Sequence, residues 1–412
     1  MEWFSIIVVA IMVCFSIAGI VDTLFLKDKL GLGPEFKKGF EMIGPLCLSI
    51  VGIISFAPVI AWAIEHSLGL LYDLIGLDPS MAVSMILAMD MGGYQVAMGV
   101  ATDPVIGTWA GTVYGSMMGA TVVFSIPVGL AAIQKKDIAV FAKGILYGIA
   151  AIPFGTFVGG LVLGVPIVTI LLNLIIPVIF SAIIIVCLAL WTNGTIKVFK
   201  GFSIFINVFS LIALAFAIIN DLILSPISAT GAFDLSSVPL FNLIASTSEG
   251  IGVAGSVGIV LSGALPFVYC LNKWLKKPLS KLSGKMGLTE YGVLGFLLSA
   301  ANNMATFSIL DKMNDREKIL NVAWAVCGAF IIGDHLAFVA SVDSTAIGAM
   351  MLSKLVAGIL AVLIAVLFTL KMKNDKVGLK PNQNRTDEET TIEDDCQNQE
   401  DLETKNRLEG EI

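Results

Sequence analysis

An aspartate interrupts an apolar stretch of the chain, where the sequence reads MDMGGY from Met89 to Tyr94. The stretch is about long enough to span a bilayer. A carboxylate at the centre of a bilayer costs about 2.5 to 3.5 kcal/mol, and such residues usually serve a function. Asp90 is therefore a candidate to face a solute, and the alternative is an acceptor for the backbone of a local turn. Gly92 and Gly93 suit that turn and would also let the backbone approach a ligand closely.

Two further polar groups interrupt apolar stretches in the second half of the chain. Asn302 and Asn303 lie in SAANNMA, where their amides could contact a solute or brace a loop. Asp334 and His335 lie in IIGDHLAFVA. A hydrogen-bonded Asp and His pair could bind a hydroxyl, relay a proton or fasten two helices together.

Other candidates have equally plain structural explanations. Glu41 and Glu249 lie near the starts of apolar segments, where a carboxylate can rest at the membrane interface or at a helix N-terminus. Ser116 and Thr121 lie beside a stripe of four glycines at positions 107, 111, 115 and 119. The stripe favours close helix packing, and the two hydroxyls could face the solute path.

Long apolar segments must position these residues, since 57% of the chain is hydrophobic and its mean hydropathy is +0.90. We expect an all-α polytopic membrane protein with eleven apolar segments, at 4–26, 42–64, 80–101, 106–132, 139–164, 166–192, 201–224, 250–272, 288–310, 319–342 and 348–371. From Met372 to Ile412 the chain has 12 acidic and 6 basic residues, and we predict a disordered acidic tail. The rest of the chain is almost neutral, so nothing indicates a nucleic-acid partner.

The two halves of the chain resemble each other. Asp22 matches Asp221, and Glu41 matches Glu249, each glutamate being followed 17 residues later by a proline. Two further stretches also match: MMGATVVFSIPV matches IIGDHLAFVASV, and KGILYGIA matches KLVAGILA. In the same alignment Asp90 corresponds to Asn302. We predict a first repeat at 1–165, a linker helix at 166–199, a second repeat at 200–371 and the tail at 372–412.

Loop charges predict the topology, because short loops rich in lysine and arginine stay in the cytoplasm. Eleven full crossings would place some basic loops outside. The rule holds if 80–101 and 288–310 are re-entrant hairpins, which leaves nine crossings. The N-terminus is then outside, the tail is in the cytoplasm and the two repeats are inverted. MDMGGY and AANNMA become the tips of two hairpins that meet near the midplane, where inverted-repeat transporters bind their solutes.

The charges inside the apolar segments indicate the sign of the solute. All three arginines lie outside these segments, and Lys143 and Lys354 lie near segment ends from which they can reach the interface. The remaining buried ionisable groups are acidic apart from His335, which favours a cationic or neutral polar solute. No nucleotide-binding loop, zinc motif or metal-spaced Cys and His cluster occurs, so we expect a transporter and neither an enzyme nor a cofactor or metal site.

At these residues the chain resembles the ethanolamine permease family of bacterial ethanolamine utilisation. The resemblance covers about residues 1 to 370 and rests on DMGG at Asp90, GSMMG at Gly115, FSIPV at Phe124, ANN at Ala301 and GDHL-x-F at Gly333. It implies a carrier in the cell membrane that takes up ethanolamine, especially when acid keeps the solute protonated.

The residues fit such a solute. An ammonium suits Asp90, with Asp334 as second choice, and a hydroxyl suits Asn302, Asn303 and His335. The inward-negative membrane potential would drive entry of the cation. Two alternatives stay open: a carrier for another small polar solute, such as an amino alcohol or a carboxylate, and a membrane sensor or scaffold that acts through the acidic tail. The sequence also leaves open whether the chain forms a homo-oligomer.

Overall fold

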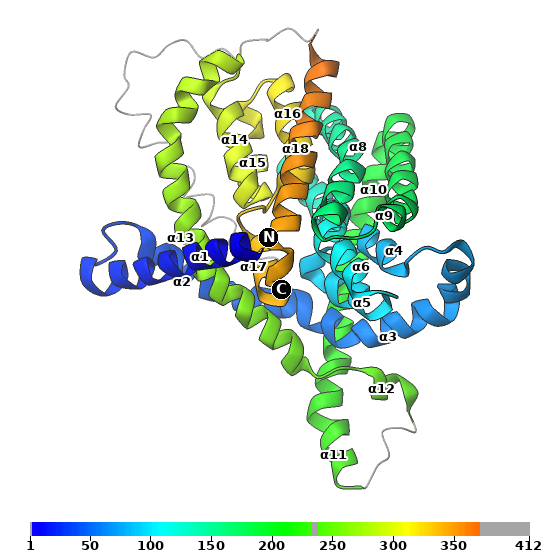
Figure 1. The fold of residues 1–412 in the computed structure, drawn as a ribbon. Coiled ribbons are helices and arrows are strands. Elements are labelled where there is room, and N and C mark those ends of the chain that lie inside the picture. The colour runs from blue at the N-terminus through cyan, green and yellow to red at the C-terminus, as the bar shows by residue number, and fades with distance from the viewer. Residues whose placement is uncertain (1, 232–237, 371–412) are drawn as a thin grey trace.

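The computed structural model describes residues 2–231 and 238–370, and this part of the chain is built from helices, turns and short extended pieces without a strand (Figure 1). The predicted all-α class is confirmed. Seven helical runs are long and apolar enough to cross a membrane: Trp3–Leu26, Leu32–Ser67, Pro104–Ala132, Lys135–Val162, Ile167–Ala229, Leu240–Leu275 and Ser344–Thr369. The predicted acidic tail at 372–412 lies outside the described residues.

Eight of the eleven expected segments fall within these seven runs. Segments 166–192 and 201–224 share one run, because α10 extends over Ile175–Ile219. A straight helix of 45 residues would be about 68 Å long, against a hydrocarbon core of about 30 Å. The helix bends at Trp191, whose backbone is not helical, with φ of −143° and ψ of 55°.

The other three expected segments are broken into short helices. Segment 80–101 contains α4 (Pro79–Ile86), η2 (Met89–Met91) and α5 (Gly93–Val100). Segment 288–310 contains α14 (Glu290–Ala301) and α15 (Asn303–Ser308).

Our expectation that 319–342 is one unbroken segment is wrong. It divides into α16 (Asp315–Gly328) and α17 (Asp334–Val342). Phe330 between them has a φ of 58°, a value that ends a helix.

Three helices pack together at the centre of the molecule, namely α8 (Ile138–Val162), α16 and α18 (Ile347–Thr369) (Figure 1). Glycines on α8 allow this contact, because a Cβ at Gly144 or Gly148 would collide with Val322 or Val326 of α16. The π-helix η3 (Trp109–Gly119) packs against all three. Close packing through small residues is the usual way for helices to associate within a membrane.

A second group of helices contains α1 (Glu2–Val21), α2 (Leu32–Glu41), α3 (Ile43–Ile75) and the long α13 (Thr247–Met286). Of these, α1, α2 and α3 run across the direction of α18 in Figure 1. Shorter elements connect the two groups: η1 (Asp22–Leu26), α6 (Pro104–Thr108), η4 (Thr121–Ser125), α7 (Ile126–Ala132), η5 (Lys135–Asp137), α9 (Ile167–Asn173), η6 (Asn220–Leu224), α11 (Ser225–Ala229), α12 (Pro239–Leu243), η8 (Leu310–Lys312) and η9 (Ser344–Ala346).

Residues matched between the two halves occupy comparable places in the fold. Asp22 begins the π-helix η1, and Asp221 lies in the π-helix η6. Asp22 Oδ2 accepts a hydrogen bond from Leu32 N at 2.8 Å, where α2 begins, and Asp221 Oδ2 accepts one from Thr247 N at 2.8 Å, where α13 begins. The matched prolines, 58 and 266, both lie inside long helices.

Candidate functional site

The breaks in three segments lie against one another. Backbone amides between α16 and α17 bond to the end of α14, with Phe330 N donating to Ser299 O at 2.9 Å and Ile332 N to Ala300 O at 3.0 Å. The element η2, at the break of the first broken segment, contacts both α17 and η3. Backbone that is not helical therefore gathers in one place, as at the solute sites of transporters with discontinuous helices.

The first broken segment folds back on itself. Thr102 N donates to Asp78 Oδ2 at 2.9 Å, so the two ends of the segment lie side by side. Gly92 makes the turn with a φ of +81°, and a Cβ there would collide with Ile53 of α3. Gly93 begins α5 and donates from its backbone nitrogen to Ala88 O at 3.0 Å. Both glycines thus shape the turn that carries Asp90.

The second broken segment has the same closure. Thr289, before α14, donates from Oγ1 to Glu317 Oε2 of α16 at 2.9 Å. At the break, Asn302 is extended, with a φ of −153°, and its Oδ1 accepts from Met304 N at 2.8 Å to cap α15. Asn302 therefore supports the backbone at the break.

Asp90 differs from the other carboxylates within the helical body. It is 28% exposed, and its Oδ2 lies 4.0 Å from Nε2 of His335, whose side chain is 2% exposed. In the described part of the chain its carboxylate accepts no hydrogen bond from another residue's side chain. Asp22, Asp78 and Glu317 each accept at least three hydrogen bonds. Asp90 alone among these four keeps its oxygen lone pairs available for a ligand.

The predicted Asp334 and His335 pair lies at the start of α17, directly after the break. His335 Nδ1 is buried and has no hydrogen-bond partner among the described residues. The His335 ring packs on Phe330, with centroids 4.8 Å apart. Of the two residues, His335 faces Asp90. Asp334 is half-buried and has an interaction partner of its own.

Asn303 is fully buried and reaches a different helix. Its Nδ2 donates to Ser125 Oγ at 2.8 Å, while its Oδ1 has no partner among the described residues. A buried amide oxygen without a donor is unusual, since nearly all such atoms are paired.

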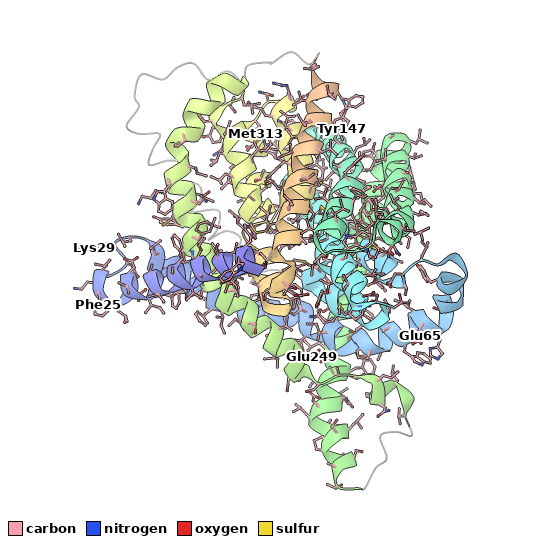
Figure 2. The ribbon with its side chains drawn as sticks, viewed as in Figure 1. Phe25, Lys29, Glu65, Tyr147, Glu249 and Met313 are labelled. Atoms are coloured by element: carbon pink, nitrogen blue, oxygen red, sulfur yellow. The ribbon has the colours of Figure 1, made fainter. Side chains whose placement is uncertain are left out.

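The remaining candidate residues either donate their hydrogen bonds to the backbone or lie away from the broken segments. The hydroxyls of Ser116 and Thr121 are buried and donate to the carbonyls of Val113 at 2.9 Å and Met117 at 2.6 Å. Glu41 ends α2 and Glu249 lies in the first turn of α13, where Figure 2 labels it; both are exposed. These two glutamates are not brought to the broken segments.

The glycine stripe packs against the first broken segment, which confirms its expected role in packing. A Cβ at Gly111 would meet Tyr94 at 2.8 Å, and one at Gly115 would meet Met89 at 3.6 Å. A Cβ at Gly119 would collide with the carbonyl of Leu87. The smooth face of η3 thus lets the turn at Asp90 lie close to the centre of the molecule.

Lys354 lies against η3, and the sequence analysis did not single it out as a candidate. We expected it to reach the membrane interface, and this is wrong: the residue is 0% exposed and its Nζ donates to the carbonyl of Ser116 at 2.8 Å. A signal was present in the sequence. The residues three, four and seven positions further along α18 are all small, namely Ala357, Gly358 and Ala361. They lie on the same face of the helix as Lys354, and a face of small residues packs against protein rather than lipid.

The described residues offer three groups whose chemistry suits an ammonium or a hydroxyl. These are the carboxylate of Asp90, which faces His335, the unpaired Nδ1 of His335 and the unpaired Oδ1 of Asn303. In the described residues no three His, Cys, Asp or Glu side chains gather in a way that could hold a metal ion.

Comparisons with known proteins cover almost the whole helical body. Residues 4–368 match the family model described as "Ethanolamine utilisation protein, EutH". A "Probable ethanolamine permease EutH" of Listeria monocytogenes serotype 1/2a (strain 10403S) is 37% identical over 390 residues, which cover 94% of this chain and 98% of that protein. A protein of the same name from Escherichia coli (strain K12) is 34% identical, with 84% of this chain and 88% of that protein covered.

A third relative carries no functional name. The "Uncharacterized protein YxeR" of Bacillus subtilis (strain 168) is 37% identical over 354 residues, which cover 86% of this chain and 92% of that protein. No solved structure matches the chain significantly. Relatives named as permeases and seven apolar helical runs together identify a multi-pass membrane protein.

Proposed function

Because the chain belongs to the family of the ethanolamine utilisation protein EutH, we propose that it is a secondary transporter that takes up protonated ethanolamine across the cytoplasmic membrane. The relatives from Listeria monocytogenes and Escherichia coli are named probable ethanolamine permeases, which supports the choice of solute. The carrier works by alternating access, and the inward-negative potential draws the cation in.

The observation that carries the proposal is the state of the Asp90 carboxylate. It is partly exposed, although it lies at the break of a segment packed among buried helices. A charged group is stable in such a place only when it is paired or hydrogen-bonded, and the described protein atoms supply little of either. A protonated amine from the solute would supply both the charge and the donors.

The hydroxyl of the solute binds to groups that lack a partner in the protein. Asn303 Oδ1 and His335 Nδ1 are both buried and unpaired in the described part of the chain. Asn302 and the glycines beside Asp90 hold the backbone that brings these groups together. Ser116 lies in η3 and Thr121 begins η4, and both support the solute path by bonding to backbone carbonyls of η3.

The two segments 80–101 and 288–310 are re-entrant hairpins in this proposal. The hydrogen bonds from Thr102 to Asp78 and from Thr289 to Glu317 support it, because a spanning helix would hold those ends far apart. The chain then has nine crossings in two inverted repeats, 1–165 and 200–371, joined by the linker helix, with the tail in the cytoplasm. The matched positions of Asp22 and Asp221 support the repeat.

The test is uptake of labelled ethanolamine at acidic external pH by cells that lack other uptake routes. Asp90→Asn should lower uptake about tenfold or more, because it removes a charge-assisted bond to the ammonium. Asp103→Asn is a matched control, since the exposed Asp103 only caps α6 and asparagine caps equally well.

Full uptake by Asp90→Asn, with unchanged amounts of protein in the membrane, would overturn the role of Asp90. Competition by unlabelled amino alcohols and carboxylates establishes the solute class. Stronger competition by a carboxylate than by ethanolamine would contradict the proposal.

A further inference from the structure

Lys354 is a buried cation that the transport proposal does not use. The residue lies in the central helix α18 and is buried, and its Nζ donates to the main-chain carbonyl of Ser116 at 2.8 Å. A lysine ammonium has three N–H donors. The described residues provide one acceptor for them, so two donors lack a protein partner.

Lys354 lies beside the proposed solute site. Its acceptor residue, Ser116, follows Gly115, and Gly115 packs against Met89, which directly precedes Asp90. Two elements that pack on α18 carry titratable groups, namely Cys327 on α16 and the Asp334 and His335 pair on α17. Asp90 lies on η2, which packs on α17 and on η3, the helix that contains Ser116.

Charged groups on the other neighbours of α18 are exposed or hydrogen-bonded. On α8, Tyr147 stacks on Phe368, which lies about 21 Å further along α18, and Lys143 is exposed. Asp343, which directly precedes η9, accepts hydrogen bonds from Thr108 and Thr345. We therefore assign the carboxylate of Asp90, which accepts no hydrogen bond from another described side chain, as the anion that balances a protonated Lys354.

A cationic solute at Asp90 changes this balance. Two positive charges would then share one carboxylate in a region of low dielectric, where like charges repel strongly. Burial penalises an ammonium with too few acceptors, and lysine, unlike arginine, releases its proton readily when buried.

We propose that Lys354 balances the charge of the solute site by releasing a proton when a cationic solute binds at Asp90 and by regaining it when the solute has left. This inference rests on the proposed uptake of a cation. In the step, an Nζ–H bond breaks, the electron pair stays on nitrogen, and the proton passes to water at the face to which the site is open. After the solute has left inside, the empty site reopens to the outside and Lys354 regains a proton there, so one positive charge enters the cell per cycle.

The experiment measures the number of protons released when ethanolamine binds to the purified full-length protein. Titration calorimetry in buffers with different ionisation enthalpies gives this number, and it is repeated from about pH 5 to pH 8, the range in which buried lysines titrate. We expect release of about one proton per solute at the acid end of this range. Binding without proton release at every pH would overturn the inference.

Three variants locate the proton. Lys354→Met should bind ethanolamine at least as tightly as the parent and release no proton, because the competing cation is gone. Lys354→Arg should bind about tenfold or more weakly, again without release, because a guanidinium keeps its proton. Lys143→Met is the matched control, since Lys143 is the exposed counterpart of Lys354 in the first repeat, and it should behave like the parent.

The opposite effects of methionine and arginine separate charge balance from a packing role. Equal losses of affinity in both variants, or proton release retained in Lys354→Met, would overturn the inference. A parent protein that does not bind ethanolamine at all would instead contradict the proposed function. Elution as a single species in gel filtration confirms that each variant is folded before it is titrated.

Discussion

At the scale of single residues, the hydrogen bonds separate carboxylates that hold the fold from the one that is free to bind. Asp78 accepts bonds from the backbone and hydroxyls of Ser80 and Thr102, so it joins the two ends of the first broken segment. Asp90 has no such donors and faces His335 at 4.0 Å. From the sequence alone both are aspartates at the borders or centres of apolar stretches.

We predict that Asp78→Asn lowers thermal stability in detergent, whereas Asp103→Asn does not. The amide nitrogen would face N–H and O–H donors, and each buried group left unpaired costs about 1 to 3 kcal/mol. The melting temperature of each purified variant is the measurement. An unchanged melting temperature for Asp78→Asn would show that the closure of the hairpin does not depend on this charge.

At the scale of elements, non-helical backbone is confined to places where the helices are packed against protein. The turn at Gly92 lies against Ile53, and the break after α16 bonds to the end of α14. Backbone amides without partners are tolerated at membrane depth only under such cover. The packing of the breaks therefore explains why these segments need not be continuous helices.

We predict that Gly92→Ala abolishes most uptake. Its φ of +81° is unfavourable for alanine by about 1 to 2 kcal/mol, and the added Cβ would also collide with Ile53, which would shift the turn that carries Asp90. Gly252→Ala in α13 is the control, because no atom lies within 4 Å of the position of its Cβ. Uptake assays at equal amounts of protein in the membrane test this, and normal uptake by Gly92→Ala would contradict it.

We also predict that the two hairpin tips are reached from opposite faces. In a variant without native cysteines, Met91→Cys should react with an impermeant thiol reagent added outside, and Met304→Cys only with reagent added inside. Lys136→Cys, in the loop between α7 and α8, serves as the control for the cytoplasmic face. Labelling of both tips from one face would rule out inverted repeats.

At the scale of the whole molecule, the described helices form one membrane body with few charges inside it. The buried pair of Lys318 and Asp137, 2.8 Å apart, neutralises itself. Lys354 is buried in α18, and Asp90 lies in η2, within the first broken segment. A body with so little net charge can admit one cation at a time without a permanent counter-ion from solution.

We predict that an inside-negative potential accelerates uptake by protein reconstituted in lipid vesicles. One positive charge crossing 100 mV gains about 2.3 kcal/mol, which supports about 50-fold accumulation of the cation. Labelled ethanolamine inside the vesicles is measured with and without a potassium diffusion potential. The same accumulation in both cases would show that charge does not move with the solute.

The sequence by itself determined the all-α class of the protein and eight of its eleven expected segments, and it named Asp90, Asn303 and His335 as candidates. Hydropathy and chain length decide these features locally, because about 20 apolar residues suffice to cross a bilayer. The predicted repeat pairs segment 80–101 with segment 288–310, since similar residues recur in the same order in both halves of the sequence.

Only the tertiary structure decided which polar groups are satisfied and which are free. Lys354 bonds to a carbonyl 238 residues away, and Asn303 to a hydroxyl 178 residues away. The break between α16 and α17 is likewise held by contacts to α14. Such contacts depend on how distant helices pack, and no local pattern of residues specifies them.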